Sequence, residues 1–211
     1  MGFQDTFSKT CDGVARVGRL LTTFDGRPIT AKKSSLSEYP ATDKPLVIHI
    51  WGIKTPREGV YGQFHGCASY DGVVINSNGF RDNTGSIEGT VRNNAIIESQ
   101  VFVLSPEKMG LSPEVLKKNM IVESRKKKDY NLFADNCVDH LVRPMQAAGS
   151  DINFGMIATP RELSEWCEKA VNSGKGVLIS AEEYQRALKD KTSIVYHAPQ
   201  QSLGNMAAKS R

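Results

Sequence analysis

The stretch from Leu46 to Leu104 constrains the fold most, because it contains short hydrophobic segments separated by glycine, asparagine and aspartate. The segments are LVIHIWG (46–52), GQFHGCAS (62–69), GVVIN (72–76) and AIIESQVFVL (95–104). Their β-branched and aromatic residues are typical of strands. Tyr70-Asp71-Gly72, between the second and third segments, predicts a tight hairpin, since glycine accepts the positive φ of such a turn. The sequence therefore predicts a central antiparallel sheet.

Helical patterns flank this region on both sides. The expected helix starts are, in chain order, residue 3, Ser112-Pro113, Asp135 or Asn136, Thr159 and Ser180. Pro144 is expected to kink or end the helix that contains Cys137. We therefore predict a single α+β domain over residues 1–211, with its core at about 46–148 and a loose tail at 197–211.

Composition excludes several function classes. A net charge of +4 is mild, and the basic residues are scattered apart from Lys126–Lys128, so a nucleic-acid partner is not expected. The cysteines form neither a CxxC pair nor a cluster at zinc spacing, so we expect no metal and no cofactor. No apolar run approaches the length of a membrane span, and the first residues lack the pattern of a secretory signal. We therefore expect synthesis in the cytoplasm without a signal peptide.

Cys137 lies at an expected helix start, within DYNLFADNCVDHL (129–141). A helix N-terminus lowers the pKa of a thiol, because free N–H groups and the positive end of the helix dipole stabilise the thiolate. The N–H of Cys137 could also stabilise an oxyanion. Alternatively, Cys137 is a small buried residue that packs with Leu141 and Met145. The sequence alone favours neither interpretation.

His65 is the preferred base for such a thiol. It lies on a predicted strand, and its small neighbours Gly66 and Ala68 leave room for a helix end to approach. Folding of the hairpin should bring Asn76 roughly opposite His65, where its side-chain oxygen could orient the imidazole. Asn78 is the alternative orienting residue.

The remaining histidines and cysteines have plainer interpretations. His140 shares a helix with Cys137, and we expect a partly exposed helical residue and not a base. His49 is expected on the polar face of its strand. Cys67 should be a strand-packing residue, and Cys167 should lie in the core, as should Cys11.

The order of these residues resembles the circularly permuted branch of the papain-like NlpC superfamily. In that order a histidine strand comes first, then a polar residue on the next strand, then a late cysteine at a helix start. The matching pieces are FHGCASYDGVVINSNGF and YNLFADNC, and the resemblance covers about residues 46–148. It implies a papain-like fold in which Cys137 is the nucleophile, His65 the base and Asn76 the orienting residue. Many relatives carry a histidine as this third residue.

Within that superfamily, the chain is most similar to effectors of type VI secretion systems that attack the peptidoglycan of rival bacteria. The resemblance implies a secreted antibacterial hydrolase of peptidoglycan peptide bonds that acts in the periplasm of a target cell. It also implies a cognate immunity protein and a partner in the secretion apparatus. Tyr61 or Tyr130 would supply the second oxyanion donor. The alternatives are an acyltransferase, isopeptidase or deamidase of the same fold, or a non-catalytic binding module.

Overall fold

The computed structural model describes residues 27–54, 60–76, 98–126, 135–154, 158–191 and 194–195. These ranges contain most of each strand predicted from the sequence. The helix expected at 3–21, the tail expected at 197–211 and Cys11 lie outside them.

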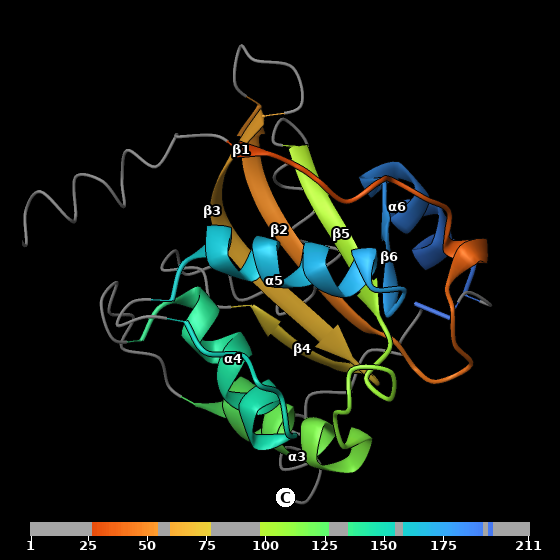
Figure 1. Cartoon of the computed structure of the whole chain (residues 1–211). Coiled ribbons are helices and arrows are strands. Elements are labelled where there is room, and N and C mark those ends of the chain that lie inside the picture. Colours follow the sequence, from red (N-terminus) through yellow and green to blue (C-terminus); the bar gives the residue numbers. More distant parts are fainter. Residues whose placement is uncertain are drawn as a thin grey trace, which may run out of the picture.

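The described strands form one antiparallel sheet (Figure 1). They are β1 (Arg27–Pro28), β2 (Leu46–Lys54), β3 (Val60–Tyr70), β4 (Val73–Asn76), β5 (Glu98–Leu104) and β6 (Gly176–Ile179). Their order is β1-β3-β2-β5-β6, and β4 pairs with β3. The four strands expected within 46–104 are confirmed. The sequence does not predict β6, because four residues are too few to show a strand period.

The predicted hairpin joins β3 to β4. Tyr70 pairs with Val73 across the turn, and both central residues have positive φ, 44° at Asp71 and 81° at Gly72. This conformation matches the twist of antiparallel strands. The Asp71 carboxylate also binds two lysines, Lys44 and Lys117, each at 2.5 Å. These ion pairs anchor the turn to the loop before β2 and to the helix that follows β5.

Within the described ranges, four α-helices and one short 3-10 helix accompany the sheet. They are η1 (Leu36–Glu38), α3 (Pro113–Arg125), α4 (Cys137–Ala147), α5 (Pro160–Asn172) and α6 (Ala181–Lys189). The starts expected near Ser112, Asn136, Thr159 and Ser180 are confirmed, although Ser112 makes no side-chain cap hydrogen bond. Helix α4 does not end at Pro144, because burial of its residues on both sides of the proline stabilises the helix as far as Ala147.

The helices cover both faces of the sheet (Figure 1). Ile48 and Ile50 of β2 belong to a core shared with α3, α4 and α5, whereas Val47 packs on the other face, in a second core that includes Tyr184 of α6. His49 is fully buried on this second face, with its ring centroid 4.4 Å from that of Tyr184. The expectation that His49 lies on a polar face is therefore wrong. The prediction of an α+β fold with an antiparallel sheet packed against helices is confirmed.

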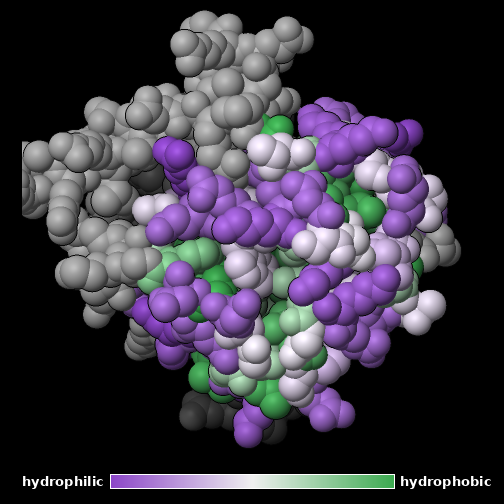
Figure 2. All heavy atoms as spheres, in the orientation of Figure 1, coloured by the Kyte–Doolittle hydropathy of each residue, from purple (hydrophilic) through white to green (hydrophobic). Residues whose placement is uncertain are grey.

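The surface on the side of α5 is mostly hydrophilic, and hydrophobic atoms show there in small separate areas (Figure 2). Among the described helices, none combines the length and the hydrophobicity that crossing a bilayer requires.

Candidate functional site at the start of helix α4

Asn136 determines where helix α4 begins. Its side-chain oxygen accepts hydrogen bonds from the N–H of Val138 at 2.8 Å and of Asp139 at 3.2 Å. The Asp139 carboxylate in turn accepts the N–H of Asn136 at 2.9 Å, which completes a capping box. Cys137 is therefore the first residue of α4. Of the two cap positions expected from the sequence, Asn136 is confirmed.

The Cys137 side chain lies beside Gly66 of β3. Burial raises the pKa of its thiol to about 11, although backbone hydrogen bonds from Gly66, Val138 and Cys137 itself act to lower it. Only 4% of Cys137 is exposed. The bond from Gly66 places the sulfur close to β3. The expected depression of the pKa is thus outweighed by loss of hydration.

Gly66 allows the helices to approach β3 closely. A Cβ atom at this position would lie 3.3 Å from Leu163 Cδ2 of α5 and 3.4 Å from Leu141 Cδ1 of α4. Both distances are at or below the limit of ordinary van der Waals contact. The expectation that a small residue beside His65 leaves room for a helix is confirmed.

The structure places Cys137 beside Gly66, the residue after His65. The side chains of Cys137 and His65, however, lie on different sides of β3. Side chains alternate along β3, so His65 lies on the face of Cys67, whereas Gly66 faces Leu141. His65 is half-buried. Because Cys137 shares a core with Leu141, its side chain and the imidazole lie on different sides of β3.

The structure describes the backbone of the expected orienting residue. Asn76 pairs with Cys67 across the hairpin, two residue pairs from the expected position opposite His65. The side chain of Asn76 lies outside the described residues, as do Asn78, Tyr130 and the side chain of Tyr61.

The other described thiols are packing residues. Cys67 and Cys167 are each fully buried, and burial raises the pKa of both thiols well above the ordinary value. The expectations that Cys67 packs within its strand and that Cys167 lies in the core are confirmed.

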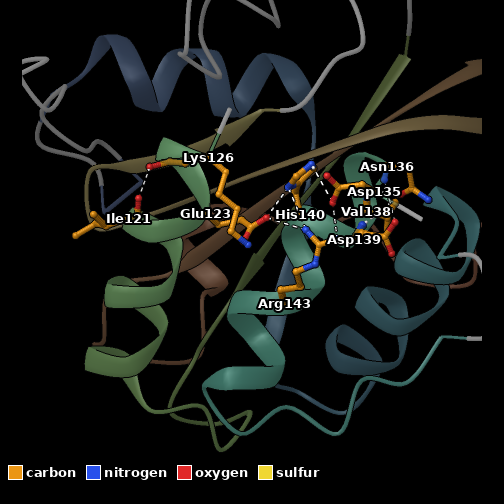
Figure 3. Close-up of polar contacts among 10 residues, drawn as sticks. Ile121, Glu123, Lys126, Asp135, Asn136, Val138, Asp139, His140 and Arg143 are labelled. Atoms are coloured by element: carbon orange, nitrogen blue, oxygen red, sulfur yellow. Dashed lines mark hydrogen bonds and ion pairs between the residues drawn. The ribbon is translucent and has the colours of Figure 1, made fainter. Parts of the chain in front are cut away.

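A second group of polar residues lies where α3 packs against α4 (Figure 3). His140 Nδ1 lies 2.5 Å from Glu123 Oε1, and Arg143 Nη1 donates to the same oxygen at 3.0 Å. Arg143 Nη2 donates to Asp135 Oδ1 at 2.5 Å. His140 is 1% exposed, so the expectation of a partly exposed residue is wrong. We call Glu123, His140, Arg143 and Asp135 the α3–α4 ion cluster.

Glu123 is the centre of this cluster. Burial acts to raise the pKa of its carboxyl, but hydrogen bonds from Lys126, His140 and Arg143 outweigh burial and hold the pKa below its ordinary value. The carboxylate is therefore ionised and accepts the proton carried by His140 Nδ1. His140 Nε2 is buried, and no hydrogen-bond partner is found for it within the described residues. It lies 3.6 Å from Asp135 Oδ1.

A sequence signal for this cluster was available. Leu116, Met120 and Glu123 are the buried residues of α3, and their spacing puts all three on one helical stripe. A carboxylate on an apolar stripe requires a buried partner on the facing element. The sequence does not identify that partner, because helix pairing depends on the tertiary fold.

A pocket of about 450 Å³ lies elsewhere, between α5 and the segment after α4. Its lining includes Phe154, Trp166, Glu162 and Lys169, but neither Cys137 nor His65. Within the described ranges, no group of three or more histidine, cysteine, aspartate or glutamate side chains could hold a metal ion.

Comparison of the chain with protein-family models, curated proteins and solved structures finds no match. The functional interpretation therefore depends on the geometry around Cys137 and on the resemblance of the motifs that contain it.

Proposed function

We propose that this protein is a cysteine hydrolase of amide bonds, with Cys137 as the nucleophile and His65 as the base. The observation that carries the proposal is the position of Cys137 as the first residue of α4, buried beside Gly66 of β3. The Val138 N–H already donates to Asn136 Oδ1, so the candidate donors to an oxyanion are the N–H groups of Cys137 and Gly66. Such donors stabilise a thiolate first and then the oxyanion of the tetrahedral intermediate. Gly66 thus joins Tyr61 and Tyr130 as a candidate for the second oxyanion donor.

The raised pKa determines how the thiol would react. With a pKa of about 11, on the order of one Cys137 thiol in ten thousand is ionised at pH 7. A base must therefore take the proton as the sulfur attacks. The imidazole of His65 would reach the sulfur around the edge of β3. Between the pairing with β1 at Tyr61 and with β4 at Cys67, no described strand covers this edge.

The reaction would proceed by acyl transfer to water. Cys137 Sγ bonds to the amide carbonyl carbon while its proton passes to His65. Collapse of the intermediate breaks the C–N bond, and His65 gives the proton to the leaving amine. Water then attacks the thioester, with His65 as base, and the thiol is restored. Asn76, or Asn78, would orient the imidazole.

The substrate class follows from the motif resemblance to type VI secretion effectors. We propose the peptide stems of peptidoglycan, reached in the periplasm of a target cell. The net charge of +4 favours approach to an anionic polymer. An immunity protein and a secretion-apparatus partner belong to the same proposal.

Digestion of purified sacculi tests this function. The wild type should release new muropeptides, detected by mass spectrometry, whereas Cys137→Ala and His65→Ala should release none. Cys167→Ala, at an equally buried thiol on α5, is the matched control and should retain activity. If the wild-type digest equals that of Cys137→Ala, peptidoglycan is not the substrate.

The burial of Cys137 favours a second candidate, a binding module without catalysis. Cys137 shares its core with Leu141 and Met145, as the alternative interpretation of the sequence expects. In that case iodoacetamide would modify Cys137 no faster than Cys167, even when a substrate analogue is present. Selective modification of Cys137 would favour the hydrolase.

A further inference from the structure

The α3–α4 ion cluster is connected to Cys137 through the chain itself. Asp135 stands two residues before Cys137, and its carboxylate accepts the hydrogen bond from Arg143 Nη2. Arg143 lies two turns further along α4, and its other terminal nitrogen donates to Glu123 of α3. One guanidinium therefore joins the segment before α4 to the neighbouring helix. Figure 3 shows these side chains converging between the two helices.

His140 strengthens the same connection. Its Nδ1 binds Glu123 Oε1 at 2.5 Å, and its Nε2 is directed at Asp135 Oδ1, 3.6 Å away. The ring thus lies between the two carboxylates that Arg143 also joins. Lys126 Nζ occupies the second oxygen of Glu123 at 2.6 Å, so both oxygens of this buried carboxylate are used.

We propose that Glu123, His140 and Arg143 are positioning residues that hold Cys137 against β3, beside Gly66. They fix the segment from Asp135 to Cys137 from the side of α3, while the Asn136 side chain fixes it from the side of α5 through the carbonyl of Ala158. Without the ion cluster, the first turn of α4 loses its attachment to α3. The sulfur then leaves the N–H of Gly66 more often, because that contact depends on where the first turn lies.

The importance of this hold for catalysis rests on the proposed function, but the hold itself can be measured without a substrate. A buried thiol is alkylated from the locally open form of the protein. Weakening the closed form raises the alkylation rate by the same factor as the open population. Cys167, fully buried on α5, serves as the internal reference.

The test compares two glutamates of similar burial on different helices. Glu123→Gln removes the charge that binds His140 and Arg143, whereas Glu168→Gln does the same to a carboxylate that binds Thr30. Iodoacetamide labelling, followed by mass spectrometry of each cysteine peptide, should show Cys137 reacting about tenfold faster or more in Glu123→Gln, as expected for loss of a charge-assisted hydrogen bond. Glu168→Gln should leave the Cys137 rate near wild type. Equal Cys137 rates in the two variants overturn the proposal.

Three further variants keep the test decisive if Glu123→Gln does not fold. Asp135→Asn acts at a residue whose side chain is 32% exposed, and it weakens the contact with Arg143 without burying a charge. Arg143→Lys retains the charge and should restore part of the protection that Arg143→Met loses. If Asp135→Asn and Arg143→Met both label like the wild type, the cluster does not position Cys137.

The labelling test and the test of the proposed function can fail independently of each other. If the sacculus digest shows no activity, the labelling rates still report whether the ion cluster holds Cys137. If the hydrolase is active and the rates do not respond, only the positioning role is lost. Where both hold, Glu123→Gln should lower kcat with little change in KM, because it displaces the nucleophile and not the substrate-binding residues.

Discussion

Asn136 Nδ2 donates a hydrogen bond to the carbonyl oxygen of Ala158 at 2.9 Å, while the other end of the same amide caps helix α4. Ala158 precedes Thr159, the N-cap of α5. One side chain therefore determines where α4 begins and ties that start to α5. Because Cys137 follows Asn136 directly, the position of the thiol depends on both contacts.

Replacing Asn136 with alanine should weaken both the fold and the protection of Cys137. Loss of the cap costs about 1 kcal/mol, and the buried bond to Ala158 adds about the same again. Urea unfolding should therefore show a loss of about 2 kcal/mol, with faster iodoacetamide labelling of Cys137.

Ser180→Ala is the matched control, because Ser180 caps α6 through the N–H of Glu183 on the other face of the sheet. It should cost about 1 kcal/mol and leave labelling of Cys137 unchanged. Equal labelling in the two variants would mean that the cap does not position the thiol.

Features determined by neighbours in the chain could be predicted from the sequence. The Asp71-Gly72 turn and the capping box at Thr159 each depend on a few consecutive residues, and both are confirmed. The start of α4 at Cys137 follows from the same local chemistry.

Features that depend on distant contacts could not be predicted. His140 has the sequence context of a surface residue, and only the arrival of Glu123 from α3 explains its burial. His49 was expected on a polar face because helix α6, which covers it, lies far along the chain. The prediction of a lowered pKa for Cys137 is wrong for the same reason. The effect of a helix start depends on neighbouring residues, whereas burial depends on distant ones.

The thiol of Cys137 should make stability fall at alkaline pH. Its pKa is raised from about 9 to about 11 in the folded protein, so its contribution is complete below pH 9 and is lost as pH rises to 11. The loss approaches about 1.4 kcal/mol per pH unit for one such group. Urea unfolding of wild type and Cys137→Ala between pH 8 and 11 measures it. The variant should show the shallower decline, and parallel curves would contradict the raised pKa.

His49 should make the protein sensitive to acid. Burial lowers the pKa of its imidazole from 6.5 to about 3, so its contribution to stability is complete above pH 6.5 and is lost as pH falls to 3. The full loss is on the order of 5 kcal/mol. His49→Phe keeps a ring against Tyr184 but cannot be protonated, so its unfolding free energy should fall less between pH 7 and 4. Equal slopes for the two proteins would contradict this origin of acid sensitivity.

Gly66→Ala tests how closely α4 and α5 approach β3, whereas Gly176→Ala tests the packing of backbone within the sheet. Its new Cβ meets Leu141 and Leu163, whose flexible side chains can shift by a few tenths of an ångström, so we expect a cost of about 1 kcal/mol. At Gly176 the Cβ would lie 2.4 Å from the carbonyl oxygen of Val103, a backbone atom, so Gly176→Ala should cost about 3 kcal/mol or more. Urea unfolding measures both costs. Because Leu141 belongs to α4, Gly66→Ala should also speed alkylation of Cys137; a variant that is destabilised without faster labelling would show that α4 keeps its place when β3 is crowded.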